Sequence, residues 1–283
     1  MNAQEQRDIA LVLSSGGARG LAQIGAIEEL EAHGYRIGSI AGTSMGALVG
    51  GVYAAGKMSE LRQMMKSMGK WKMLSLVDFS FSFNHIVKGD KVVDALKSLL
   101  SDIKIENLSI PFCAISTDWE RGEEVVFRQG SLIDAIRASI SLPALFNPMQ
   151  AGGRILIDGG VINPLPLNRV ERHDGDILVA VDVSGHDYWG QRQVQKRTEA
   201  RRRRNMMLDK LTPSNTDVNY LSLLTRASSL MIRQNSLLME QLVPPDILID
   251  IQMSRYDGMD YDKSEKIIEV GRQKTRKTLE GKH

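Results

Sequence analysis

The sequence predicts an α/β protein with three layers, in which a mostly parallel central sheet is flanked by helices. Short β-type runs alternate with helical patterns through the first half of the 283 residues. Two of the strand-to-helix connections, at residues 14–18 and 42–46, contain the glycines that such tight turns require. Hydrophobic residues at 42% and charged residues at 25% are typical of a folded globular chain, which excludes disordered and collagen-like classes.

The first two strand–helix units are the clearest in the chain. Ile9–Leu13 predicts a buried strand, and a helix is expected from Arg19 to its stop at Gly34. A second strand at residues 37–41 leads into a helix over Met45–Gly56. Because this helix is apolar on nearly every side, we expect it to be central and buried.

The remaining elements are weaker repetitions of the same patterns. Further strands are expected at residues 112–116, 124–128, 154–158, 177–183 and 247–251, and further helices at residues 91–100, 131–139, 218–242 and from 263 onward. The composition becomes more polar after about residue 187. We expect a single domain over residues 8–283, with its motifs in 8–185 and a helical, basic addition in 186–283.

Charge and cysteine content narrow the functional class. A net charge of +2 creates no general attraction to nucleic acid, so no nucleic-acid partner is expected. The single cysteine, Cys113, excludes an internal disulfide. The polar N-terminus lacks the apolar segment of a signal peptide, and no apolar run approaches the ~20 residues of a membrane span. These features predict a soluble, cytoplasmic protein.

The glycine-rich loop at residues 14–20 does not match a dinucleotide-binding turn. Ser15 stands where that motif has its first glycine, and the next strand ends in Ala41-Gly42, where an acidic residue should meet the ribose. Two interpretations remain. The loop is either an ordinary tight turn, or a set of outward-facing N–H groups at a helix N-terminus that favours a negative charge such as an oxyanion.

The second loop fits the Gly-x-Ser-x-Gly pattern of a nucleophile elbow, with Ser44 at its centre between Gly42 and Gly46. A strand precedes the pattern and an apolar helix follows it, as the elbow requires. The alternative is a serine that only caps the helix.

A serine nucleophile needs a base, and the sequence offers two kinds. Asp158 ends a predicted strand and is followed by Gly159 and Gly160, an arrangement that is also found in simple turns. His173 and His186 both follow an acidic residue in the order used by α/β-hydrolases, and His186 is the better of the two because it follows a strand.

Together, these motifs resemble the patatin-like phospholipase family over about residues 8–185. The matching segments are Gly16–Gly20, Gly42–Gly46, Asp158–Gly160 and the stretch from Arg137 to Pro148. The resemblance implies a patatin-like fold and a serine lipid acyl hydrolase that cleaves fatty acyl esters of phospholipids or lysophospholipids, with no cofactor or metal. Ser14 and Ser15 depart from the family pattern, in which small or acidic residues end in glycine.

The resemblance also assigns residues to roles. Ser44 is implied as the nucleophile and Asp158 as its base, while the amides of Gly16, Gly17 and Ala18 form the oxyanion hole. The remaining motif residues support these groups; they are Arg19, Gly20, Gly42, Gly46, Gly159 and Gly160. Acyl transfer or thioester hydrolysis at the same site, a Ser-Asp-His esterase that uses His186, and a non-catalytic lipid-binding protein remain as alternatives.

Two further segments bear on lipid binding. The methionine-rich stretch from Met58 to Phe83 suits an acyl-chain pocket or a lid, and equally suits the protein core. A basic run contains Arg201, Arg202, Arg203 and Arg204. The run predicts either a solvated helix face or peripheral contact with an anionic membrane.

Overall fold

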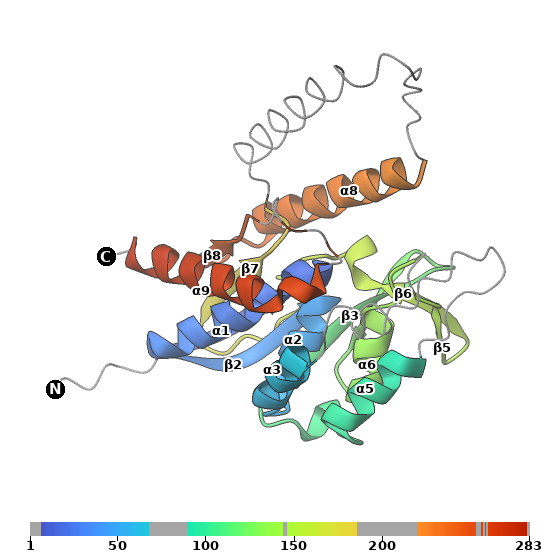
Figure 1. Cartoon of the computed structure of the whole chain (residues 1–283), viewed down its shortest axis with the longest axis horizontal. Helices are drawn as coiled ribbons and strands as arrows, with labels where there is room; N and C mark the ends of the chain where they lie inside the picture. Colours follow the sequence, from blue (N-terminus) through green and yellow to red (C-terminus); the bar gives the residue numbers. More distant parts are fainter. Residues whose placement is uncertain are drawn as a thin grey trace, which may run out of the picture.

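The computed structural model describes residues 7–67, 90–143, 146–185, 220–252, 256, 258 and 260–281. Eight strands form one sheet in the order β5-β6-β3-β2-β1-β7-β8, and β4 also pairs with β3 (Figure 1). The pairs β1–β2, β1–β7, β2–β3 and β7–β8 are parallel, whereas β3–β4, β3–β6 and β5–β6 are antiparallel. The predicted mostly parallel sheet is therefore confirmed.

The elements have the following bounds. The strands are β1 (Arg7–Leu13), β2 (Tyr35–Thr43), β3 (Phe112–Asp118), β4 (Glu123–Phe127), β5 (Met149–Ala151), β6 (Arg154–Asp158), β7 (Ile177–Asp182) and β8 (Ile247–Asp250). The α-helices are α1 (Ala22–Ala32), α2 (Met45–Ala54), α3 (Met58–Ser67), α5 (Asp90–Leu100), α6 (Leu132–Ser139), α8 (Tyr220–Leu242) and α9 (Ser264–Glu280). Short 3₁₀ turns are η1 (Gly17–Leu21), η2 (Ile105–Asn107), η3 (Gly159–Val161) and η4 (Tyr261–Lys263).

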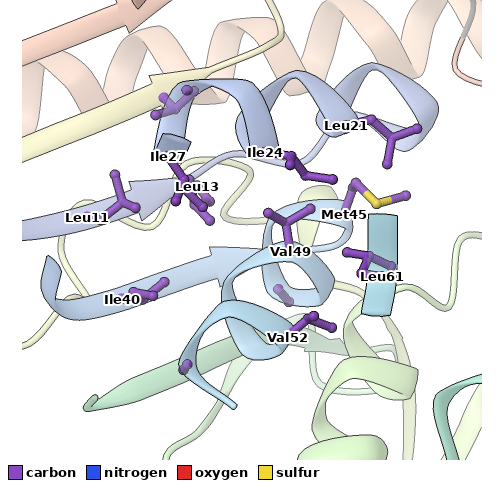
Figure 2. Packing of buried hydrophobic residues seen from close by; sticks show 14 of the residues in the cluster. Leu11, Leu13, Leu21, Ile24, Ile27, Ile40, Met45, Val49, Val52 and Leu61 are labelled. Atoms are coloured by element: carbon purple, nitrogen blue, oxygen red, sulfur yellow. The ribbon is translucent and has the colours of Figure 1, made fainter. Parts of the chain in front are cut away.

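The two faces of the sheet are covered differently. One face packs against α1, α2, α3, α5, α6 and α9 in the main hydrophobic core. Figure 2 shows the centre of this core, where Val49 and Val52 of α2 lie among side chains of the sheet and of α1. The other face carries a smaller core, formed with Leu165, Leu167 and Met239 from the chain after β6 and from α8. Helices and loops on both faces give the three layers that the sequence predicts.

Strand β3 brings together two strand ends that are far apart in the sequence. Its first half pairs with β2, with Thr43 opposite Ile115, and its second half pairs with β6, with Asp158 opposite Ser116. Strand β4 pairs with β3 across both halves. Because a strand has only two edges, β2 and β6 share the other edge, and their C-terminal ends meet head to head.

The C-terminal region completes the same sheet and core. Strand β8 extends the parallel sheet beyond β7, and α9 packs along α1 (Figure 1). The two helices touch at Gly25 and Gly271, since a Cβ on Gly271 would lie 1.8 Å from the carbonyl oxygen of Ala22. Glu29 of α1 also accepts hydrogen bonds from Arg276 of α9 at 2.8 and 3.0 Å.

Several predicted elements differ in detail from the structure. The helix expected from Arg19 to Gly34 is divided into η1 and α1, because the glycine loop continues as a 3₁₀ turn before the α-helix begins. The antiparallel strand β5 was not expected; it has only three residues, Met149–Ala151, too few to show an alternating pattern. Met58–Ser67 is helix α3, with Leu61 and Met65 in the core, and the part of the methionine-rich stretch after residue 67 lies outside the described residues.

Within the described part of the chain, no helix combines the length and apolar character that a membrane crossing would require.

Candidate active site

Ser44 occupies a strained turn between β2 and α2. Its φ of 55° and ψ of −119° place a non-glycine residue in a region that L-amino acids rarely adopt, and the residue is only 8% exposed. The backbone N–H of Ser44 donates a hydrogen bond to Ser139 Oγ at 2.8 Å, which holds the turn against α6. This is the conformation of a nucleophile elbow, in which the side chain projects from a sharp strand-to-helix turn.

The glycines on either side of Ser44 are required by close backbone contacts. A Cβ on Gly42 would lie 2.4 Å from the carbonyl oxygen of Gly46, and a Cβ on Gly46 would lie 2.2 Å from the carbonyl oxygen of Leu13. Any larger residue would push α2 away from the ends of β1 and β2. The Gly-x-Ser-x-Gly spacing therefore has a packing reason in this fold.

The head-to-head meeting of β2 and β6 brings Ser44 and Asp158 into contact. Ser44 Oγ donates a hydrogen bond to Asp158 Oδ2 at 2.6 Å. The other carboxylate oxygen, Oδ1, accepts the N–H of Gly160 at 2.7 Å, and the backbone N–H of Asp158 donates to the carbonyl of Ser141 at 3.0 Å. The carboxylate is thus fixed in orientation from both sides. Gly159 lies against β3, with a Cβ position 2.3 Å from the carbonyl oxygen of Ile115.

Burial changes the acid–base property of Asp158. Removal from water raises the pKa of this carboxyl from its ordinary 3.8 to about 6, although the hydrogen bonds from Ser44 and Gly160 act in the opposite direction. A carboxylate with this pKa is still charged at neutral pH and is a stronger base than an exposed aspartate. It can therefore accept the proton of a hydroxyl that attacks an electrophilic carbon.

The glycine loop packs directly against the elbow. Gly17 has a φ of +57°, which favours glycine, and Arg19 Nε donates to the carbonyl of Gly16 at 3.3 Å, so Arg19 helps to hold the loop. Gly20 contacts Met45, the residue after Ser44, since a Cβ on Gly20 would lie 2.4 Å from Met45 Cγ. Loop, nucleophile candidate and carboxylate therefore form one continuous site.

The amides of the loop are not equivalent. The N–H of Ala18 donates to the carbonyl of Gly258 at 2.7 Å, so it is already used in the described conformation. The acceptor belongs to a chain segment more than two hundred residues away, and the assignment of the Ala18 amide to the oxyanion hole stays a prediction. No described residue accepts a hydrogen bond from the amides of Gly16 or Gly17.

Of the two histidines that the sequence offers as alternative bases, the structure describes only His173. His173 is exposed, its backbone N–H donates to Asp176 at 2.8 Å, and its ring lies 3.5 Å from Glu171. Among the described residues, its hydrogen bond and its ion pair are made with Asp176 and Glu171 and not with Ser44. His186 and the basic run of Arg201, Arg202, Arg203 and Arg204 lie outside the described residues. In the described part of the chain, no group of three or more His, Cys, Asp or Glu side chains could hold a metal ion.

Sequence reasoning missed three groups that support the site. The hydroxyl of Ser139 accepts a hydrogen bond from the N–H of Ser44. The carbonyls of Ser141 and Gly258 accept hydrogen bonds from the N–H groups of Asp158 and Ala18. The two serines lie in the stretch from Arg137 to Pro148 that carried part of the family resemblance, so a signal for them was present. Nothing in the local sequence around Gly258 connects it with the glycine loop.

Comparison with known proteins places this site in a family. The family model for patatin-like phospholipases matches residues 11–170, which include every motif residue of the site. An uncharacterized NTE family protein of Mycobacterium tuberculosis is 43% identical over 179 residues, which are 63% of this chain and 50% of that protein. The chain thus aligns with about half the length of this relative.

Two other relatives and one solved structure extend the comparison. Patatin-like phospholipase domain-containing protein 7 of Mus musculus is 29% identical over 94% of this chain and 20% of its own length. Neuropathy target esterase sws of Drosophila melanogaster is 30% identical over 63% of this chain and 13% of its own length. The crystal structure of VipD from Legionella pneumophila is similar in fold, with a TM-score of 0.50, 15% identity and coverage of 99% of this chain and 67% of that chain. Because the family model matches more than half of its residues, this chain belongs to the patatin-like phospholipase family.

Proposed function

We propose that the chain is a serine lipid acyl hydrolase that cleaves fatty acyl esters of phospholipids, lysophospholipids or related lipids. The observation that carries this proposal is the 2.6 Å hydrogen bond from Ser44 Oγ to the buried Asp158 carboxylate, with Ser44 at a positive φ between β2 and α2. The substrate class is supported by the family and by the names of the phospholipase-domain and esterase relatives.

The reaction proceeds in two steps through an acyl-enzyme. Asp158 takes the proton of Ser44 as Oγ attacks the ester carbonyl carbon, and then gives this proton to the leaving alcohol oxygen. Water attacks the acyl-enzyme in the second step and gives a proton to Asp158, which returns it to Ser44 Oγ as the fatty acid leaves. The amides of Gly16 and Gly17 stabilise the oxyanion formed in both steps, because neither is used by a described residue.

Hydrolysis of 4-nitrophenyl butyrate and of lysophosphatidylcholine by five matched variants tests the proposal. Ser44→Ala should remove all activity above background, and Asp158→Asn should lower kcat/KM by at least roughly 10²-fold, since proton transfer is lost. The control Ser98→Ala changes an exposed helical serine and should leave the rate unchanged. Activity that persists in Ser44→Ala would refute the nucleophile assignment.

The same experiment separates the rival mechanisms. His173→Ala and His186→Ala should retain wild-type kcat/KM within a few-fold if Asp158 is the base. If His186→Ala is inactive while Asp158→Asn is only impaired, a Ser-Asp-His esterase replaces the dyad. Acyl thioesters and added alcohol acceptors distinguish a thioesterase or an acyltransferase that uses the same site.

Contact with an anionic membrane through Arg201, Arg202, Arg203 and Arg204 is part of the proposal. Each basic residue near such a surface contributes about 1 kcal/mol of attraction. Flotation with vesicles that contain anionic lipid should show binding of the wild type and weaker binding of a variant in which all four arginines are glutamine. Equal flotation of the two proteins would exclude this contact.

A further inference from the structure

Ser15, the last residue before the glycine pair, has a buried hydroxyl without a partner. Its backbone is fully used, since its N–H donates to the carbonyl of Pro164 at 2.8 Å and its carbonyl accepts the hydroxyl of Ser14 at 3.1 Å. The residue is only 4% exposed, and Ser15 Oγ is buried and has no hydrogen-bond partner among the described residues. A buried hydroxyl that stays unpaired is costly, so this oxygen is expected to bind something during the working cycle.

The position of this hydroxyl is next to the base. A Cβ placed on Gly160 would lie 3.0 Å from Ser15 Oγ and 3.0 Å from Asp158 Oδ1. The two oxygens therefore both lie beside Gly160 and are at most twice that distance apart, so Ser15 Oγ is a close neighbour of the carboxylate oxygen that does not contact Ser44.

The hydroxyl of the neighbouring Ser14, unlike that of Ser15, has hydrogen-bond partners. Ser14 Oγ donates to the Ser15 carbonyl and accepts the N–H of Val183 at 3.0 Å, so its hydroxyl ties the loop to the chain after β7. The hydroxyl of Ser14 therefore has a structural role, as both donor and acceptor. The hydroxyl of Ser15, in contrast, has no partner among the described residues and lies near the Asp158 carboxylate.

We propose that Ser15 is a positioning residue for the water that hydrolyses the acyl-enzyme, an inference that rests on the proposed function. Water gives one proton to the Asp158 carboxylate while its oxygen bonds to the acyl carbon and the bond from that carbon to Ser44 Oγ breaks. The second hydrogen of the same water is donated to Ser15 Oγ. Asp158 then passes its proton to Ser44 Oγ, and the fatty acid leaves.

This arrangement favours water over alcohols as the acyl acceptor. Water has a second hydrogen for Ser15 Oγ, whereas an alcohol carries a carbon group in that place and leaves the buried hydroxyl unpaired. Ser15 therefore favours hydrolysis over acyl transfer at this site.

Partition of the acyl-enzyme between water and an added alcohol tests the inference. With 4-nitrophenyl butyrate and glycerol, the ratio of butyric acid to glyceryl butyrate is measured for the wild type, Ser15→Ala, Ser15→Gly and the control Thr275→Val. Both Ser15 variants should lower this ratio by roughly fivefold, the effect of one lost hydrogen bond. Thr275 also has a buried hydroxyl without a partner, but lies on α9, so Thr275→Val should keep the wild-type ratio.

The outcomes distinguish this inference from the proposed function. If ester cleavage by the wild type does not depend on Ser44, the proposed function fails. If cleavage depends on Ser44 but the ratio is the same in the wild type and both Ser15 variants, only the inference on Ser15 is overturned. An equal loss of both products, with the ratio preserved, overturns it as well, because Ser15 would then only shape the site. The ratio is independent of the fraction of folded enzyme.

Discussion

At the residue scale, the chemistry of the site depends on how little water reaches Asp158. The residue is only 3% exposed and its carboxylate is held by Ser44 and Gly160, so its charge is stabilised by two hydrogen bonds in place of solvent. The same burial that strengthens it as a base makes its charged form costly in the folded protein. Activity and stability are therefore expected to depend on pH in opposite directions at this residue.

The pH dependence of hydrolysis follows from the pKa of Asp158. Because the base must be deprotonated, kcat/KM should be constant above the pKa of about 6 and should fall about tenfold for each pH unit below it. A pH profile for a soluble acyl ester, with enzyme stability checked at every pH, measures the midpoint. A midpoint near the ordinary aspartate value of 3.8 would contradict the role of burial.

The stability of Asp158→Asn should differ from that of the wild type in a pH-dependent way. A pKa raised from 3.8 to about 6 means that the neutral carboxyl stabilises the fold fully below 3.8, and that this contribution is lost as pH rises through about 6. The lost contribution is roughly 3 kcal/mol. The variant, which is always neutral, should be more stable than the wild type above about pH 7 and similar to it near about pH 4. Urea unfolding at both pH values checks this, and a constant difference would contradict it.

At the element scale, strand ends and helices are joined by specific polar groups. Strand β3 aligns the ends of β2 and β6, and Ser139 of α6 receives the N–H of the elbow. In the C-terminal part of the chain, Arg233 of α8 reaches Asp182 at the end of β7 at 2.7 Å, with Glu240 at 3.8 Å and Asp250 at 3.9 Å. One guanidinium therefore compensates three carboxylates between α8, β7 and β8.

Replacement of Arg233 should destabilise the protein strongly. The Asp182 side chain is fully buried, so Arg233→Met would leave an uncompensated charge in the core, at a cost of about 3–5 kcal/mol. The control Arg36→Met removes a pair with Asp8 whose side chains are 60% and 43% exposed, and should change the stability little because solvent screens this pair. Urea unfolding at neutral pH compares the two. Equal losses would show that α8 is not held by this cluster.

At the scale of the whole molecule, the segment after the family match is part of the same structure. The family model ends at residue 170, yet β7, β8 and α9 complete the sheet and its helical cover, and Gly258 bonds to the glycine loop. The N-terminal motifs therefore depend on contacts made by the last part of the chain. The prediction of one domain over residues 8–283 leads to a direct test.

Truncation after residue 185 should abolish stable folding. The shortened chain would expose the edge of β7 that pairs with β8 and the apolar surface of α1 that packs against α9. We expect aggregation or a loss of cooperative thermal unfolding, measured by circular dichroism and gel filtration beside the full chain. A soluble fragment with a sharp melting transition would instead show that residues 8–185 form an independent domain.

The local sequence determined the strand–helix alternation, the buried helix α2 and the candidate nucleophile Ser44. These features depend on apolar periodicity and on glycines within a few residues, which a linear sequence displays directly. The three-residue strand β5 and the 3₁₀ turn before α1 escaped prediction because such short elements carry no period of their own.

Only the tertiary structure decided how distant residues meet. The sequence left Asp158 and His186 open as bases, whereas pairing of β6 with β3 brings Asp158, 114 residues along the chain, to Ser44 Oγ. The tertiary structure also brings the carbonyl of Gly258 to the amide of Ala18, and it places the buried hydroxyl of Ser15 beside Gly160. Register between strands and contact between loops result from packing of the whole chain, so no local pattern encodes them.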